Sequence, residues 1–130
     1  MKTHLIRHAC PIKTREHHAT WKINPEDCKN VKGLLKDYDL FFCSPLRRSI
    51  ETGYALFPDA RWIVLPELEE INKPEETQEE FAERVKKGFS KILDLMIGVE
   101  DVLISSHSRW MRTLIGDLDK EIPYLGVIEV

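Results

Sequence analysis

Short apolar runs alternate with longer segments of helical period along the chain. The apolar runs predict strands at residues 3–7, 39–43, 61–65, 101–105 and 124–130. Between the strands, the pattern predicts helices that begin near Asn24, at Ser44, at Thr77 and at Arg109. Alternating strands and helices are typical of an α/β fold with a mainly parallel central sheet. There is no repeat and no linker, so residues 1–130 are expected to form a single domain.

The helix predicted from Thr77 has the clearest pattern. Thr77 and Glu80 have the Thr-x-x-Glu spacing of a capping box, which marks a helix start. Apolar residues then recur at helical spacing, namely Phe81, Val85, Phe89, Ile92 and Met96. Gly98 is expected to end this helix.

Three other helices are predicted from their starts and apolar residues. Asn24 is a favourable cap, and the proline that follows it suits the first helical position. An apolar stripe on that helix would consist of Val31, Leu34 and Leu35. Ser44, also followed by proline, is expected to cap a second helix, and a third is predicted over residues 109–118.

Composition limits the class of protein. The chain has 130 residues, of which 42% are hydrophobic and 32% are charged, as is ordinary for one globular domain. Its apolar runs are too short to cross a bilayer, and its first residues lack a signal-peptide pattern. The net charge of -3 disfavours general nucleic-acid binding. We therefore expect neither a membrane nor a nucleic acid as a partner.

The cysteines indicate a reducing compartment. Cys10, Cys28 and Cys43 are odd in number and lack paired spacing, which argues against a disulfide framework. We therefore expect a cytoplasmic location. The sequence does not determine the oligomeric state.

Residues suited to binding phosphate follow the ends of three predicted strands. Arg7 and His8 end the first strand, Ser44 follows the second, and His107 follows the fourth. In open parallel sheets, ligands bind outside the carboxyl ends of the strands, so these side chains are expected to meet in one crevice. Helix starts at Ser44 and near Ser108 would add backbone N–H groups and a positive dipole end, which favour a bound phosphate.

Four segments carry a resemblance to a known family. They read Leu-Ile-Arg-His-Ala over 5–9, Ser-Pro-Leu-Arg-Arg-Ser-Ile-Glu-Thr over 44–52, Leu-Glu-Glu over 68–70 and Val-Leu-Ile-Ser-Ser-His-Ser over 102–108. In this order they resemble the histidine phosphatase superfamily, which includes phosphoglycerate mutases and compact phosphohistidine phosphatases. The resemblance covers nearly the whole chain and places Arg48, rather than Arg47, on the family arginine. It implies a three-layer sandwich with helices flanking a mainly parallel central sheet.

The resemblance and the residue chemistry together predict a phosphatase site. Arg7, Arg48 and His107 would hold a phosphoryl group, because arginine can bind two phosphate oxygens at once. Ser108 is a further phosphate-binding candidate, since its side chain could donate a hydrogen bond or narrow the pocket. His8 would attack phosphorus and form a phosphohistidine. The scheme requires no metal and no cofactor.

Three neighbouring carboxylates compete for the role of the general acid. Glu70 matches the family position and would protonate the leaving group and then activate water. Glu67 and Glu69 stand in the same cluster and stay open as alternatives. Only residues 71–76 separate Glu70 from the next helix start, which leaves no room for the long lid of the mutases. We therefore expect an open site and a phosphatase rather than a mutase.

Several alternatives stay open at this point. The substrate would be either a small phosphorylated molecule or a phosphoprotein. Ala9 and Ser108 replace two glycines of the family pattern, and a phosphate-binding module without turnover is the second hypothesis. A metal-dependent hydrolase is the third. Metal-ligand residue types do occur, at Cys10, His17, His18 and Cys28, but without the short spacing of zinc ligands.

Overall fold

The structure is a computed structural model that describes residues 2–33 and 35–130. Leu34, predicted to lie in an apolar stripe, and Met1 fall outside the described residues. The strands are β1 (Lys2–Arg7), β2 (Leu40–Cys43), β3 (Trp62–Val64), β4 (Asp101–Ser106) and β5 (Val127–Glu129). The α-helices are α1 (Lys29–Lys32), α2 (Arg47–Leu56), α3 (Gln78–Leu95) and α4 (Ser108–Ile115). Short 3-10 helices are η1 (His18–Thr20), η2 (Pro25–Cys28) and η3 (Pro66–Leu68).

The five strands form one sheet in the order β3-β2-β4-β1-β5. All neighbouring pairs are parallel except β1 and β5, which confirms the mainly parallel sheet. Arg7 pairs with Ser106 and Cys43 pairs with Ser105, so β1, β2 and β4 end at the same edge. The residues that follow these three strands are therefore brought together, as the sequence predicted.

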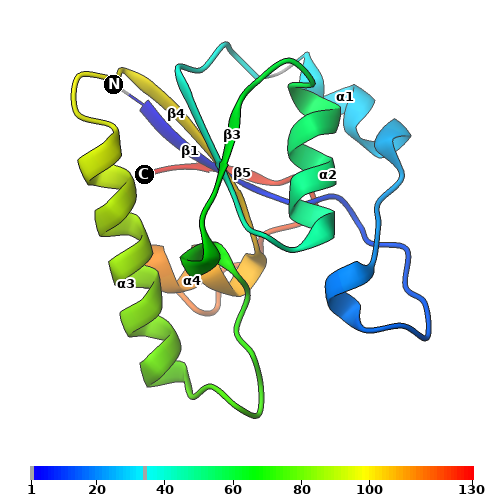
Figure 1. Ribbon diagram of the computed structural model, residues 1–130, viewed down its shortest axis with the longest axis vertical. Coiled ribbons are helices and arrows are strands. Elements are labelled where there is room, and N and C mark those ends of the chain that lie inside the picture. The colour runs from blue at the N-terminus through cyan, green and yellow to red at the C-terminus, as the bar shows by residue number, and fades with distance from the viewer. Residues whose placement is uncertain (1, 34) are drawn as a thin grey trace.

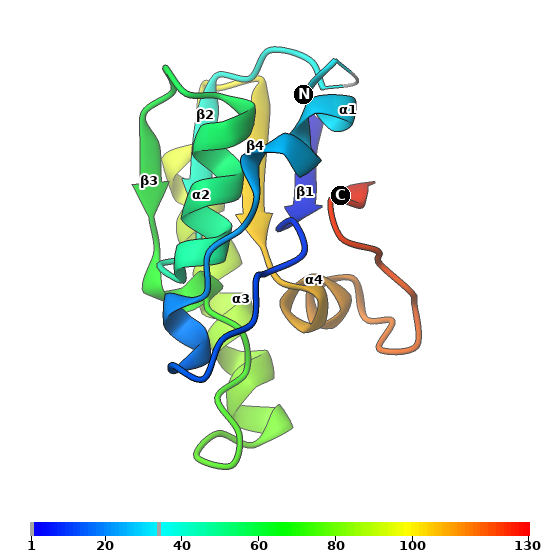
Figure 2. The same cartoon turned by 90° about the vertical axis from the view of Figure 1, so that its right-hand side faces the viewer.

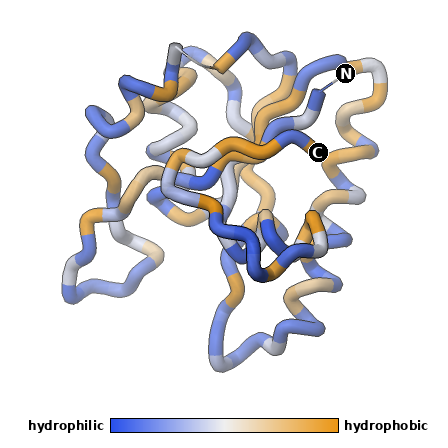
Figure 3. Tube along the Cα trace, turned by 180° about the vertical axis from the view of Figure 1, so that it is seen from behind, coloured by the Kyte–Doolittle hydropathy of each residue, from blue (hydrophilic) through white to orange (hydrophobic). Residues whose placement is uncertain are grey.

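Helices cover both faces of the sheet, which confirms the three-layer arrangement (Figures 1 and 2). On one face, apolar residues of α3 and α4 pack against strand residues such as Leu5 and Ile104. On the other face, Leu56 of α2 and Cys28 of η2 pack against Ile6. The hydrophobic stretches of the chain accordingly gather along the central strands, whereas hydrophilic stretches form the outer loops (Figure 3).

The longest helix begins as its sequence predicts. The Thr77 hydroxyl accepts a hydrogen bond from the Glu80 N–H, and the Glu80 carboxylate accepts one from the Thr77 N–H, which is the reciprocal capping box. Phe81, Val85 and Ile92 are fully or almost fully buried. The α-helix ends at Leu95, a few residues before the expected Gly98, which adopts a positive φ of 81° in the turn that follows.

Two predicted boundaries at the carboxyl end of the chain are wrong. The helix predicted over 109–118 ends at Ile115, because Gly116 adopts the left-handed conformation and caps it. The strand predicted over 124–130 forms only from Val127, since Leu125 has a positive φ of 61° and turns the chain before it pairs with β1. Tyr124 is thereby left outside the sheet.

Two predicted helix starts are also corrected. The Asn24 side chain does accept a hydrogen bond from a backbone N–H, but the helix that it caps is first 3-10 and then only one turn of α-helix. Ser44 does not cap α2, which begins at Arg47 after Leu46. The Ser44 hydroxyl accepts from the Leu46 N–H and faces the second histidine instead.

The helices are short or strongly charged. Within residues 2–33 and 35–130, none of them is both long enough and apolar enough to cross a membrane.

Candidate functional site

The structure brings the two predicted histidines and one predicted arginine into contact at the carboxyl edge of the sheet. His8 follows β1 and His107 follows β4, and their ring centroids lie 5.1 Å apart. Arg48, in the first turn of α2, places its Nε 3.3 Å from Nε2 of His8. All three side chains are buried, with exposed fractions of 5% for His8, 0% for His107 and 8% for Arg48.

His8 is held in one tautomer. Its Nδ1 lies 2.7 Å from the carbonyl oxygen of Ala9, an acceptor, so Nδ1 carries the hydrogen. Its Nε2 accepts the N–H of Arg48 and therefore carries the lone pair. Burial, together with the positive charges of Arg48 and Arg7, lowers the pKa of His8 from 6.5 to about 4 although the Ala9 carbonyl opposes the shift. His8 is therefore a neutral imidazole at neutral pH, with its lone pair on Nε2.

The loop after His8 is anchored to α2. The Ala9 N–H donates to the Thr52 hydroxyl at 2.9 Å, and that hydroxyl donates to the Arg48 carbonyl at 2.7 Å. Ala9 and Thr52 are both fully buried. The carbonyl that orients His8 is thus fixed by the helix that also carries Arg48, which couples the two segments of the predicted motif.

His107 is bound by Ser44. Its Nε2 lies 2.8 Å from the Ser44 hydroxyl, and that hydroxyl also accepts the Leu46 N–H at 3.2 Å. When the hydroxyl donates its hydrogen to Nε2, the imidazole hydrogen lies on Nδ1. Nδ1 is buried and has no hydrogen-bond partner among the described residues. Burial, then the neighbouring His8 and Arg48, lowers the pKa of His107 well below 6.5.

Arg7 contributes a second donor that is left without a partner. One of its terminal nitrogens donates to the Ile122 carbonyl at 2.8 Å, and its guanidinium carbon lies 3.9 Å from the centre of the Tyr124 ring. Its buried Nε has no partner among the described residues. In that tautomer of His107, its Nδ1 and Nε of Arg7 are two buried donors available to an anion beside His8.

The sequence did not predict a role for Tyr124. Its ring stacks on Arg7 and lies 5.8 Å from the His8 ring, centroid to centroid. This contact forms because the chain returns to β1 after α4, where the Leu125 N–H donates to the Arg7 carbonyl. No local pattern near Tyr124 signals that return.

Ser108 and Arg47 lie in different surroundings. Ser108 is the first residue of α4 and lines, with Arg7 and Tyr124, a cavity of about 550 Å³. Arg47 is exposed and pairs with Glu51 at 2.9 Å, so it lies on the solvent side of α2 while Arg48 is buried. The geometry thus agrees with the choice of Arg48 for the site.

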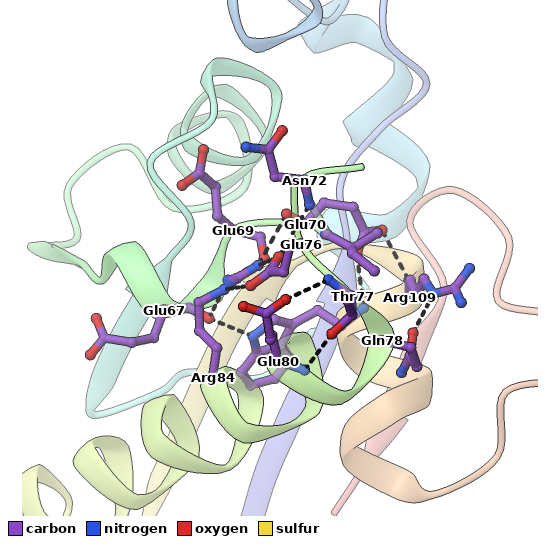
Figure 4. Close-up of polar contacts among 12 residues, drawn as sticks. Glu67, Glu69, Glu70, Asn72, Glu76, Thr77, Gln78, Glu80, Arg84 and Arg109 are labelled. Carbon is purple, nitrogen blue, oxygen red and sulfur yellow. Dashed lines mark hydrogen bonds and ion pairs between the residues drawn. The ribbon is translucent and has the colours of Figure 1, made fainter. Parts of the chain in front are cut away.

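The three competing carboxylates lie in the loop of residues 66–77, the glutamate loop, where Glu70 points towards Arg109 at the start of α4 (Figure 4). The Glu70 carboxylate accepts the N–H groups of Arg109 and Trp110 at 3.0 and 3.1 Å, in the first turn of α4. Burial raises the pKa of Glu70 although these hydrogen bonds oppose the shift. The Glu67 carboxylate instead forms an ion pair with Lys91 of α3.

Charge alone does not distinguish Glu69 from Glu70 as the candidate general acid. The negative charges of both residues act on Arg48, that of Glu70 more strongly. Glu70 differs because its carboxylate is bound to the start of the helix that follows His107. A raised pKa at such a position suits a group that must hold and release a proton.

His17 and His18, the two histidines considered above as metal ligands, lie in the loop after His8. His17 and His18 stack on each other with ring centroids 4.4 Å apart. Within residues 2–33 and 35–130, no group of three or more His, Cys, Asp or Glu side chains is arranged to hold a metal ion.

Because His8 and His107 are buried as neutral imidazoles, we expect the folded protein to lose stability in acid. An unfolded chain binds protons on histidine near pH 6.5, whereas folded His8 does so only near pH 4. The corresponding stability is complete above pH 6.5 and decreases by about 1.4 kcal/mol for each pH unit per histidine as the pH falls towards 4. Urea denaturation at pH 7 and pH 5 measures this decrease. It should be smaller in a His8→Asn variant, and an equal decrease would contradict the prediction.

Solved structures with the same fold include phosphatases and a phosphoglycerate mutase. The α-ribazole phosphatase of Shigella flexneri matches with a TM-score of 0.75 and 21% identity, over 89% of this chain and 78% of that chain. The protein histidine phosphatase SixA, solved with tungstate, matches with a TM-score of 0.74 and 19% identity, over 100% and 87%. A phosphoglycerate mutase of Thermus thermophilus matches with a TM-score of 0.69 and 18% identity, over 100% and 92%.

These neighbours are histidine phosphatase superfamily members, and the chain shares their phosphoglycerate mutase-like fold. No family model matches the sequence, and no curated protein matches it. The likeness is therefore one of structure, and it confirms the fold that the four sequence segments implied.

Proposed function

We propose, from a fold shared with the histidine phosphatase superfamily and from the arrangement around His8, that this chain is a metal-independent phosphatase. It would hydrolyse phosphomonoesters or phosphohistidine through a phosphohistidine intermediate on His8. One observation carries the proposal. A neutral His8, whose Nε2 accepts the Arg48 N–H, lies beside two buried nitrogens without partners among the described residues, Nε of Arg7 and Nδ1 of His107.

In the first step, Nε2 of His8 forms a bond to phosphorus while the bond from phosphorus to the leaving-group oxygen breaks. Arg7, Arg48 and His107 bind the phosphoryl oxygens and stabilise the charge that develops on them. The Nδ1 hydrogen of His8 stays bonded to the Ala9 carbonyl, which stabilises the positive ring of the intermediate. Ser108, which lines a cavity with Arg7, would add a hydrogen bond to the phosphoryl group.

Glu70 serves as the general acid and then as the general base. It gives its proton to the leaving-group oxygen in the first step. In the second step it accepts a proton from water, whose oxygen bonds to phosphorus as the phosphorus–nitrogen bond breaks. Phosphate leaves, and His8 and protonated Glu70 are regenerated. No metal or cofactor takes part in this scheme.

The substrate is a small phosphorylated molecule or a phosphoprotein. Only residues 71–76 separate Glu70 from Thr77, the cap of α3, so the glutamate loop carries no long lid, which favours release of the phosphoryl group to water. Free thiols at Cys10, Cys28 and Cys43 support a location in the reducing cytoplasm.

A phosphate-binding module that lacks turnover is the second candidate. The same two unpartnered donors would bind phosphate in such a module. The placement of Glu70 favours the enzyme, because a raised pKa is useful for proton transfer and not for holding an anion.

Hydrolysis of para-nitrophenyl phosphate in the presence of EDTA tests the proposal. We expect release of phosphate that EDTA does not reduce, together with acid-labile phosphate on the protein during turnover. Vanadate binding without release or labelling would favour the binding module. Release that EDTA abolishes would favour a metal-dependent hydrolase.

A further inference from the structure

Arg84, in the second turn of α3, uses every hydrogen-bond donor of its guanidinium on the glutamate loop (Figure 4). Its Nε and Nη2 donate to the two carboxylate oxygens of Glu76, both at 2.8 Å. Its Nη1 donates to the carbonyls of Glu67 and Glu69 at 3.0 and 2.7 Å, and Nη2 also donates to that of Glu70 at 3.2 Å. These bonds account for all five N–H donors of an arginine.

Glu76, the carboxylate partner of Arg84, is itself held in place by Asn72. Its Oε1 accepts the Asn72 N–H at 3.2 Å, and its own N–H donates to the Asn72 carbonyl at 2.7 Å. It directly precedes Thr77, the residue that caps α3. Residues 72–76 therefore form a closed turn that Arg84 joins to the carbonyls around Glu70.

The opposite side of the glutamate loop is bound to the β4–α4 junction, which carries the second histidine. The Ser106 hydroxyl donates to the Leu68 carbonyl at 2.9 Å, and the Trp110 indole donates to the Glu67 carbonyl at 2.7 Å. The Glu70 carboxylate accepts N–H groups of the same junction. Arg84 on one side and this junction on the other therefore determine where Glu70 lies.

Close packing leaves the loop little freedom to shift towards α3. A Cβ atom added to Gly88 of α3 would lie 2.8 Å from Cβ of Glu67, which is closer than real side chains approach. The guanidinium carbon of Arg84 also lies 4.9 Å from the centre of the Phe81 ring. A lysine at position 84 would retain the charge but could not supply five donors in one plane.

From these contacts we infer that Arg84 is a positioning residue for the proposed general acid: it fixes the carbonyls of the glutamate loop so that the Glu70 carboxylate stays at the start of α4. The inference rests on the proposed function, because it assigns Arg84 a role in proton transfer by Glu70. Arg84 makes no hydrogen bond to Arg7, Arg48 or His107 among the described residues, and its positive charge, which helps to lower the pKa of His107, is retained in a lysine variant.

Leaving-group dependence separates this role from a merely structural one. Phenyl phosphate needs a proton on its leaving oxygen, whereas 2,4-dinitrophenyl phosphate releases a stable anion. We expect Arg84→Lys to lower kcat/KM for phenyl phosphate by about 10-fold or more, and that for the dinitrophenyl ester by less than about 3-fold. Glu70→Gln should show the same pattern with a larger loss.

Combining the two variants tests whether Arg84 acts through Glu70. In the Glu70→Gln background, Arg84→Lys should change the phenyl phosphate rate by less than about 3-fold, because the acid is already absent. Lys87→Gln is the control, since this lysine is exposed on α3 whereas the Glu70 carboxylate is bound by backbone N–H groups of α4, and the variant should match wild type.

Equal losses for the two esters, or full additivity with Glu70→Gln, would overturn the inference. Thermal unfolding shows whether Arg84→Lys remains folded. If it does not, Glu76→Gln weakens the same anchor while preserving the shape of the side chain, and it should reproduce the selective loss. Failure of the wild-type protein to hydrolyse either ester would instead overturn the proposed function.

Discussion

Replacing His8 with alanine should reduce hydrolysis of para-nitrophenyl phosphate to the uncatalysed background and remove all acid-labile phosphate from the protein. The expectation follows from geometry, because the neutral His8 directs its Nε2 lone pair to the Arg48 N–H and its ring lies 5.1 Å from that of His107. Without it there is no nitrogen on which the intermediate can form. Phosphate release and phosphate bound to denatured protein are the two measurements.

His17→Ala is the matched control for the His8 variant. His17 lies in the loop after β1 but is exposed, and its ring accepts the Ala19 N–H and stacks on His18 in that loop. We expect this variant to retain wild-type turnover and labelling. Labelling that survives in His8→Ala, or that disappears in His17→Ala, would place the nucleophile elsewhere.

Replacing Arg48 with lysine should lower kcat/KM by about 10²- to 10³-fold although the positive charge remains. Lysine cannot present the planar pair of N–H groups that binds two phosphoryl oxygens. It would also lose the contacts that Arg48 makes with Nε2 of His8 and with the His18 carbonyl, 3.0 Å away. The rate with para-nitrophenyl phosphate and the affinity for vanadate should decrease together.

Arg47→Lys gives a control at the adjacent position. Arg47 is exposed and pairs with Glu51 on the solvent side of α2, so this variant should stay within about 2-fold of wild type, as exposed ion pairs contribute little. The reverse result, with a large loss in Arg47→Lys and none in Arg48→Lys, would show that the neighbouring arginine binds the phosphoryl group.

The largest part of the fold could be predicted because its signals are local. The capping box at Thr77, the apolar period of α3 and the short apolar runs each lie within one element, where propensity and burial agree. Element boundaries are harder to predict. Serine before proline is typical of a helix start, so the sequence predicts a cap at Ser44, and only the structure shows that its hydroxyl faces His107.

The sequence by itself determined which residues could meet, because residues at the ends of parallel strands must lie at one edge of the sheet. That topology brings His8, Arg48 and His107 together. Only the tertiary structure decided the rest. In the structure Glu67 forms an ion pair with Lys91, whereas Glu70 accepts N–H groups of α4, and this difference favours Glu70. Such choices depend on contacts between segments far apart in the chain, and no local pattern encodes them.

Tyr124 and Arg84 illustrate that limit most clearly. Tyr124 reaches Arg7 because the chain turns back at Leu125, and Arg84 reaches the carbonyls around Glu70 because α3 packs against the glutamate loop. In both cases the partner lies in a distant segment, and the residue types nearby give no sign of it. Residue types and their spacing therefore specified the chemistry, whereas the packing of distant segments specified its geometry.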